Sequence, residues 1–295
     1  MLTLFAIPKP FRGYIATIQY NAIQSWMRLQ PACEIILFGD DEGTAEVVRE
    51  FGLRHIPYVT LSEYGTPLLN SIFAQAQAVA SHRVLAYVNA DIILFGDFTA
   101  AVQRIPFHRF LMVGQRWNMN LEQPLDFSHP DWQSQLCECV RSQGTPNERC
   151  GIDYFVFTSG LWGEIPPFTI GRTVWDNWLI YRARAQGARV VDTSHAVMAV
   201  HQNHDYSHIR EGKTTGWEAA WNGPEAQRNL QLAGGDYTRG FTLDDATWAL
   251  PARGFVRPVL SAERLRQHWQ HLLALPLPSW RLHLTRGFLA VIVAY

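Results

Sequence analysis

The stretch Val84–Phe98, VLAYVNADIILFGDF, places an acid between two apolar runs. The first run leads to Asn89-Ala90-Asp91, apolar residues follow at once, and the stretch ends at a Gly-Asp turn. Such runs predict a buried strand, and burying a carboxylate there costs several kcal/mol unless the carboxylate is paired or binds a metal. The sequence around Asp91 must therefore supply a partner or a ligand.

Strands and helices alternate on both sides of this stretch. Apolar runs predict strands at residues 2–7, 34–38, 54–59 and 110–114, and helical spacing of apolar residues predicts helices at 15–26, 44–51, 66–80 and 98–104. This alternation is typical of an α/β fold with a mostly parallel, Rossmann-type sheet and helices on both faces. Ligands of such sheets bind beyond the carboxyl ends of the strands. Asp40, Asp91 and Gln115-Arg116-Trp117 lie at or near such ends, which indicates a site there.

The second half of the chain is less regular. A helix is expected at 131–142, strands at 151–157 and 189–200, and a helix at about 174–185 between those two strands. The composition changes beyond Gly240, where six arginines are accompanied by three acids. We therefore expect an α/β domain over residues 1–239 and a helical or irregular C-terminal extension over residues 240–295.

Composition excludes some classes of partner and favours one location. A formal net charge of -1 gives no electrostatic reason to expect nucleic-acid binding. The four cysteines form no CxxC pair, there is no basic leader, and no apolar run approaches the ~20 residues of a membrane span. A cytoplasmic protein is expected. The tail at 280–295 alternates arginine or histidine with bulky apolar residues, so it either packs on the domain or contacts the inner face of a membrane peripherally.

Asp91 and the histidines after Val200 are candidate metal ligands. A carboxylate at a strand end suits Mg²⁺ or Mn²⁺, which takes one or two carboxylates besides water and phosphate oxygens; the alternative is a local turn cap. His201, His204 and His208 are spaced by three and four residues. Three imidazoles would suit zinc, whereas His201 or His204 beside Asp91 would suit Mg²⁺ or Mn²⁺.

Four short motifs, in this order, resemble those of the GT-A class of nucleotide-sugar-dependent glycosyltransferases. Asn89-Ala90-Asp91 resembles the DxD metal motif, and Gly151-Ile152-Asp153-Tyr154 resembles the glycine-bearing segment near donor sugar and acceptor. Val174-Trp175-Asp176 resembles the xED motif, and the later histidines resemble a C-terminal metal ligand. The match spans about residues 2–208. Asn89 and Trp175 replace acids of the family pattern, so the need for a metal stays open.

The resemblance implies transfer of a sugar from a nucleoside diphosphate sugar to a hydroxyl acceptor, with Mn²⁺ or Mg²⁺ held by Asp91 and by His201 or His204. Asp176 would be the catalytic base of an inverting reaction, and a retaining reaction would give it another role. Asp176 also follows Thr173 by three residues, so it is equally placed to cap a helix. The expected substrate-binding residues are Lys9, Asp40, Asn70, Asn89, Gln115, Arg116, Trp117, Gly151, Asp153, Tyr154 and Trp175.

Two other classes of function compete with this hypothesis. A metal-dependent phosphohydrolase would use the same aspartate and histidines with water, and a non-catalytic nucleotide- or sugar-binding module would explain the lost acids at Asn89 and Trp175. The sequence leaves the nucleotide, the sugar, the acceptor and the oligomeric state open.

Overall fold

The computed structural model describes residues 1–205, 210–211 and 214–259. His208 and residues 260–295, including the tail expected to contact a membrane, lie outside the described residues. Within the described part of the chain, no helix has both the length and the apolar character that a membrane crossing requires.

Nine strands of the described residues form the main sheet, in the order β15-β14-β10-β6-β9-β4-β1-β2-β3. They are β1 (Thr3–Ala6), β2 (Glu34–Phe38), β3 (Arg54–Ile56), β4 (Val84–Val88), β6 (Phe110–Val113), β9 (Tyr154–Thr158), β10 (Arg189–Asp192), β14 (Trp248–Ala249) and β15 (Arg257–Pro258). Neighbouring strands run parallel except where β9 and β15 pair antiparallel with their neighbours. The prediction of a mostly parallel α/β sheet is confirmed.

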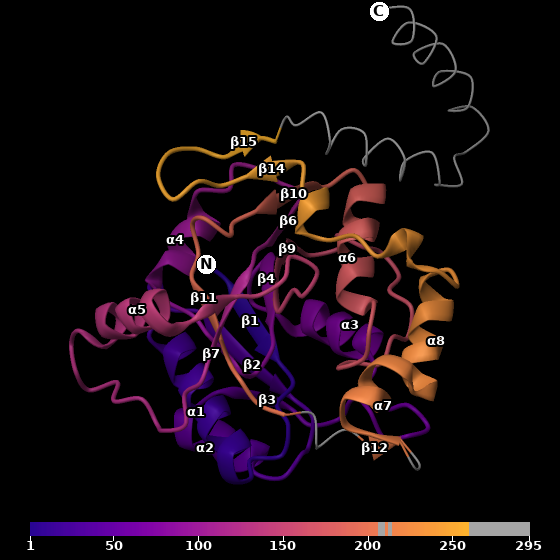
Figure 1. Cartoon of the computed structure of the whole chain (residues 1–295), viewed down its shortest axis with the longest axis horizontal. Helices are drawn as coiled ribbons and strands as arrows, with labels where there is room; N and C mark the ends of the chain where they lie inside the picture. Colours follow the sequence, from indigo (N-terminus) through magenta and orange to yellow (C-terminus); the bar gives the residue numbers. More distant parts are fainter. Residues whose placement is uncertain (206–209, 212–213, 260–295) are drawn as a thin grey trace, which may run out of the picture. The chain divides into compact units, whose positions relative to one another are not determined.

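Helices cover both faces of this sheet (Figure 1). The α-helices of the described residues are α1 (Gly13–Met27), α2 (Thr44–Phe51), α3 (Leu69–Val79), α4 (Gly96–Gln103), α5 (Trp132–Gln143), α6 (Trp175–Ala185), α7 (Gly216–Asn222) and α8 (Pro224–Ala233). In β1, Leu4 packs with residues of α1, α2 and α4, whereas Phe5 contacts Phe73 of α3. Because side chains alternate along a strand, this one strand contributes to both layers, and helices on both faces are confirmed.

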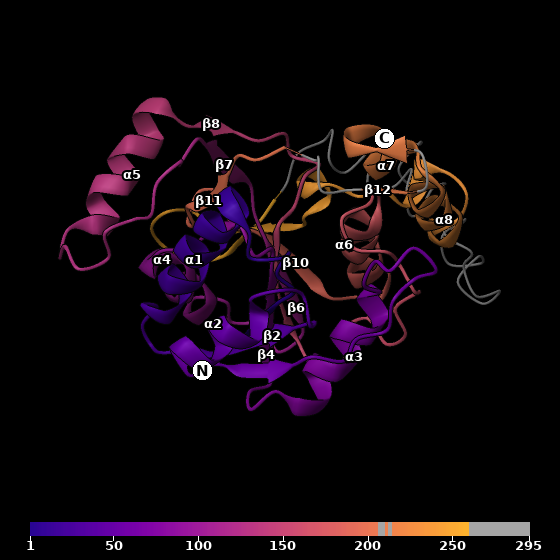
Figure 2. The same cartoon turned by 90° about the horizontal axis from the view of Figure 1, so that it is seen from below.

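A smaller sheet joins segments that are distant in the sequence. Its order is β5-β11-β7-β8, formed by β5 (Ile92–Ile93), β7 (Arg116–Met119), β8 (Thr145–Pro146) and β11 (Ala199–Gln202). It packs through apolar residues such as Met119 and Val200 against α5. The antiparallel register places His201 opposite Ile92, which brings a histidine next to Asp91. Figure 2 shows β7, β8 and β11 on the side of the molecule where α5 lies.

Two expected strands are each interrupted in the structure. The stretch Val84–Phe98 forms β4, a turn at Asn89-Ala90-Asp91, and then β5 in the other sheet. Residues 189–200 likewise divide into β10 and β11, because the chain turns at Thr193, whose carbonyl accepts from the backbone N–H groups of Ala196 and Val197. Asp91 therefore lies in a turn between two sheets and not inside a strand.

The compact unit includes the first part of the expected C-terminal extension, for which packing on the domain is one of the two expected arrangements. It runs from Met1 to Val259, so it includes residues 240–259, which the sequence analysis assigns to the C-terminal extension. These residues belong to the unit because β14 pairs with β10 and β15 pairs with β14. The remaining short elements are η1 (Tyr237–Arg239), η2 (Leu243–Asp245), β12 (Arg210–Glu211) and β13 (Thr214–Thr215).

Candidate active site

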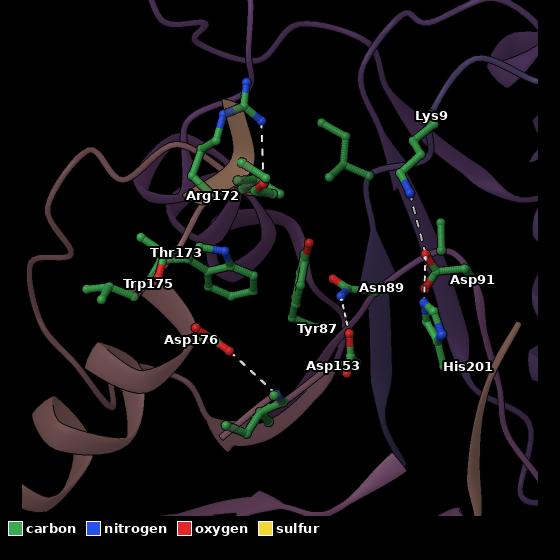
Figure 3. Close-up of a pocket in the computed structure, with 18 of the residues that line it drawn as sticks. Lys9, Tyr87, Asn89, Asp91, Asp153, Arg172, Thr173, Trp175, Asp176 and His201 are labelled. Carbon is green, nitrogen blue, oxygen red and sulfur yellow. Dashed lines mark hydrogen bonds and ion pairs between the residues drawn. The ribbon is translucent and has the colours of Figure 1, made fainter. Parts of the chain in front are cut away.

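A cavity of about 1060 Å³ lies beyond the carboxyl ends of β1, β2 and β4. It contains ten of the residues expected from the sequence: Lys9, Asn89, Asp91, Arg116, Gly151, Asp153, Trp175, Asp176, His201 and His204. Figure 3 shows Asp91, His201 and Lys9 on one side, Trp175 and Asp176 on the other, and Asn89 with Asp153 between them. The topology thus brings the four sequence motifs to one place.

Asp91, His201 and His204 form a candidate metal-binding group in which one potential ligand atom from each residue lies within 4.8 Å of the others. Gln202, which the sequence analysis missed, holds the group together. Its backbone N–H and its side-chain amide donate to the Asp91 carbonyl at 3.3 and 3.1 Å. The Gln202 side chain also bonds to Asn21 of α1, so α1, the Asp91 turn and β11 share one buried network.

The hydrogen bonds of His204 direct a lone pair toward Asp91. Nδ1 lies 2.7 Å from the carbonyl oxygen of Asp205, so we assign the proton to Nδ1, the only nitrogen that can donate there. With that proton on Nδ1, Nε2 offers its lone pair, and it lies 3.0 Å from Asp91 Oδ2. Two lone pairs at this distance require a cation or a proton beside them. Metal-ligating histidines have this pattern, with one ring nitrogen fixed by a carbonyl and the other directed at the metal.

Lys9 brings a positive charge to the same group. Its Nζ lies 3.0 Å from His204 Nε2 and 3.6 Å from Asp91 Oδ2. Burial lowers the pKa of Lys9, although the charge of Asp91 opposes this effect. Burial acts to raise the pKa of Asp91, but the contact with His204 and the positive charge of Lys9 outweigh burial and hold that pKa well below the usual range. Asp91 is therefore a carboxylate in a positively charged setting.

The residues of this group fit a divalent cation. Among the described residues, Asp91 Oδ1 and His201 Nδ1 are buried without any hydrogen-bond partner, and such an atom costs about 1–3 kcal/mol. Burial lowers the pKa of His201 against the charge of Asp91, which favours the neutral imidazole that metal ligation requires. Mg²⁺ prefers oxygen ligands throughout. A second imidazole therefore favours Mn²⁺ over Mg²⁺.

The floor of the cavity holds a second acid, Asp153. Its carboxylate accepts from Asn89 Nδ2 at 2.7 Å and from Arg116 Nη1 at 2.6 Å, and the Asn89 backbone N–H donates to the Asp153 carbonyl at 2.9 Å. The backbone bond continues the antiparallel pairing of β4 with β9 beyond Val88 and Tyr154. Asp153, directly before β9, thus places a carboxylate next to Asn89.

Asp176 lies in the first turn of α6, across the cavity from Asp91 (Figure 3). Its Oδ2 accepts a long hydrogen bond, 3.4 Å, from the Ile152 backbone N–H. Burial raises the pKa of Asp176 to about 7, against a hydrogen bond from the Asn177 backbone and with the help of the Asp153 charge. A carboxylate with a pKa near neutrality is well matched to take a proton from a substrate.

The start of α6 is held in an unfavourable conformation by its surroundings. In the described chain, Val174 is the one non-glycine residue with a positive φ, 80°, and a β-branched residue is strained there. Asn229 of α8 fixes the segment before it, accepting from Thr169 N–H at 2.8 Å and donating to the carbonyls of Thr169 and Thr173 at 3.0 and 3.2 Å. Strain of this kind persists where contacts over-determine it, often at active sites.

A buried ion pair completes this support. Arg172 Nη2 lies 2.6 Å from Glu225 Oε2, and both side chains are buried. Glu225 also accepts from the hydroxyls of Ser62 and Thr66. The sequence analysis missed Arg172, Glu225 and Asn229, because nothing in the local pattern of α8 shows that it faces the segment before α6.

Five expected substrate-binding residues do not line the cavity: Asp40, Asn70, Gln115, Trp117 and Tyr154. Tyr154 lies in the core, with its hydroxyl 2.9 Å from that of Thr193, because alternation along β9 turns it toward α4. Trp117, in β7, packs against the apolar cluster between the smaller sheet and α5. The Gln115 side chain donates to the Asn147 carbonyl. Asp40 is exposed while its neighbour Asp41 lines the cavity, and Asn70 lies half-buried in the first turn of α3.

No protein-family model and no curated protein sequence matches the chain. Among solved structures, the chain is similar to S. aureus TarS 1-349 in complex with UDP-GlcNAc, at 11% identity, over 81% of this chain and 72% of that chain, with a TM-score of 0.48. It is also similar to glucosyl-3-phosphoglycerate synthase from Mycobacterium tuberculosis in complex with Mn²⁺, UDP and phosphoglyceric acid, at 14% identity, over 79% and 78%, with a TM-score of 0.45. These similarities concern the fold alone.

Proposed function

We propose that the protein transfers a sugar from a nucleoside diphosphate sugar to a hydroxyl acceptor with the help of a divalent cation. One observation chiefly supports this proposal. A single cavity has, on one side, a carboxylate–histidine group with unsatisfied ligand atoms and, on the other, a carboxylate whose pKa is about 7. Nucleotide-sugar chemistry needs both, because a diphosphate leaves while a hydroxyl loses its proton.

The residues divide between the two substrates. Asp91, His201 and His204 would hold the cation, which when bound supplies Lewis-acid neutralisation of the departing diphosphate. Lys9, whose ammonium adjoins this group, adds a second positive charge for the phosphates. Asn89 lies between the two sides of the cavity, where its amide can bond to donor ribose or phosphate oxygens.

Asp176 serves the acceptor. Its carboxylate takes the proton of the acceptor hydroxyl, and the acceptor oxygen forms a bond to the anomeric carbon. The bond between that carbon and the diphosphate oxygen breaks, and the bonding pair leaves with the diphosphate. Attack opposite the leaving group inverts the anomeric centre.

A thermal-shift screen tests the donor half of the proposal. UDP-, GDP- and dTDP-sugars are compared with CMP-sugars, which lack the diphosphate, each with and without Mn²⁺. A ligand at 100 times its Kd stabilises a protein by about 2.7 kcal/mol, so at least one diphosphate donor should raise the Tm by several degrees, and only with Mn²⁺. Asp91→Ala should remove this shift, and Asp40→Ala, which changes an exposed acid outside the cavity, should keep it.

A phosphohydrolase acting on nucleotide sugars is the second candidate, because two imidazoles and a carboxylate are also a common catalytic zinc set. The products distinguish the two reactions. Cleavage at the anomeric carbon releases a nucleoside diphosphate, whereas a phosphohydrolase that cleaves the diphosphate releases a nucleoside monophosphate and a sugar phosphate. A donor that binds but is never consumed would instead indicate a binding module.

A further inference from the structure

We infer that the acceptor is a neutral carbohydrate chain that stacks on three aromatic side chains at the Asp176 side of the cavity. This inference rests on the proposed function and names the chemical class of its second substrate. The aromatic rim is defined as Tyr64, Trp221 and Tyr237.

All three residues of the aromatic rim line the cavity and are nevertheless exposed, by 42%, 41% and 61% of their surfaces. They come from three separate segments, namely the turn at residues 61–67, α7 and η1. Single exposed aromatic residues are ordinary in proteins. Three from different segments around one cavity indicate a binding surface.

The aromatic rim is attached to the elements that carry Asp176. The turn that bears Tyr64 is tied to α8 because Ser62 and Thr66 donate to Glu225, and Glu225 pairs with Arg172 just before α6. Trp221 lies at the end of α7, which packs against α8, and η1 contacts α6 and α8. Figures 1 and 2 both show α7 and α8 on the α6 side of the main sheet.

Two of these aromatic residues stand on short, well-defined turns. Tyr64 is in a tight turn closed by the bonds from Ser62 N–H to the Thr66 carbonyl, 2.8 Å, and from Gly65 N–H to the Ser62 carbonyl, 3.0 Å. Gly65 has a φ of 82°, which glycine adopts without strain. Tyr237 begins η1, whose N-terminus is capped by Asp236. The backbone that carries these two rings is therefore already ordered, so ligand binding has to order only the side chains.

Stacking suits sugars because the faces of aromatic rings carry partial negative charge and the C–H groups of a sugar ring are slightly positive. The charges of the cavity argue for a neutral sugar. The cations that line it among the described residues are each paired with an acid: Lys9 with Asp91, Arg116 with Asp153, and Arg172 with Glu225. The Asp176 side also has the exposed acid Glu148. A phosphorylated acceptor would be repelled there.

The full-length protein with Mn²⁺ and the donor that binds best is tested with neutral tetrasaccharides of glucose, N-acetylglucosamine, mannose and galactose. Octanol and glycerol phosphate serve as an apolar and an anionic hydroxyl acceptor. We expect at least one tetrasaccharide to accelerate release of the nucleoside diphosphate. Tyr64→Ala, Trp221→Ala and Tyr237→Ala should each raise its KM about three- to tenfold with kcat retained, whereas Tyr64→Phe and Tyr237→Phe should keep the normal KM.

Tyr58→Ala and Phe255→Ala are matched controls, because these aromatic residues are 85% and 89% exposed but do not line the cavity. They should leave the KM unchanged. If the donor binds but no tetrasaccharide accelerates its consumption, if octanol or glycerol phosphate does so equally well, or if the rim variants behave like the controls, the inference is overturned. Failure of every diphosphate donor to bind would instead contradict the proposed function.

Discussion

Asp176 determines the pH profile that we expect for the reaction. Its pKa is about 7, and it must be ionised to accept a proton, so transfer should rise with pH through about 7. Asp176→Asn should lower transfer by about 10²- to 10⁴-fold and remove this rise, while donor-induced stabilisation persists. Initial rates from about pH 5 to about pH 9, corrected for the folded fraction, provide the measurement. A wild-type profile that is flat across this range would exclude Asp176 as the base.

The same ionisation should reduce the stability of the folded protein at neutral pH. An aspartate in an unfolded chain has a pKa of about 3.9, so between about pH 4 and about pH 7 the folded state keeps a proton that the unfolded state loses. This contribution to stability is fully present below about pH 4 and is lost as pH rises through about 7. Asp176→Asn, which cannot ionise, should melt several degrees above wild type at pH 8 and together with it near pH 4. Equal melting temperatures at both pH values would contradict the raised pKa.

Lys9 should affect the cation and the donor in opposite directions. Its ammonium lies 3.0 Å from the ring nitrogen of His204 that faces Asp91, so it repels a divalent cation there. Lys9→Met should therefore tighten Mn²⁺ binding, measured by electron paramagnetic resonance in the absence of nucleotide. The same change should lower the turnover of the donor, because a positive charge near the diphosphate is lost. Weaker Mn²⁺ binding in Lys9→Met would show that the lysine supports the metal group.

At the scale of elements, α8 is expected to position α6. Asn229 makes three hydrogen bonds to the segment that precedes Val174. Asn229→Ala leaves these buried backbone groups unpaired, which should cost about 2–4 kcal/mol and lower transfer per folded molecule by more than it lowers donor binding. Gln227→Ala, an exposed change in the same helix, should alter neither. Equal losses of donor binding and transfer in Asn229→Ala would reduce α8 to a purely structural role.

Elements with a local signal could be predicted from the sequence. The helix expected at 44–51 has these bounds in the structure, where glycines in the left-handed conformation flank it at Gly43 and Gly52. The interruptions at residues 89–91 and 193–198 could not be predicted, since the flanking residues are equally apolar. What divides these runs is the exchange of partners between two sheets, which involves β strands distant in the sequence.

In the candidate site, too, residues with a local sequence signal are predictable and residues that act through distant contacts are not. Asp91, His201 and Asp176 stand in short motifs, so the sequence alone indicates them. Tyr154 was expected at the site because it follows Gly151 and Asp153, but strand alternation turns it into the core. Gln202, Glu225 and the aromatic rim act through contacts between distant segments, and no local pattern contains that information.

At the scale of the whole molecule, the described unit ends just after β15, and Val259 still donates to the Thr247 carbonyl at 2.9 Å. A version that ends at Val259 should therefore keep the wild-type Tm and the donor-induced shift. Both proteins can also be sedimented with anionic liposomes, which tests the peripheral membrane contact proposed for the tail. Co-sedimentation of the full chain alone would support that contact. If both proteins stay in the supernatant, the membrane contact is excluded.

One cavity is proposed both to hold a diphosphate donor through Asp91 and to activate a hydroxyl through Asp176. The most direct measurement is product analysis of UDP-, GDP- and dTDP-sugars incubated with the full-length protein and Mn²⁺, with Asp91→Ala and Asp176→Asn in parallel. We expect one donor to give a nucleoside diphosphate and a transferred or free sugar, Asp91→Ala to lose both binding and products, and Asp176→Asn to bind the donor but form almost no product. Release of a nucleoside monophosphate, or normal product formation by Asp176→Asn, would contradict this claim.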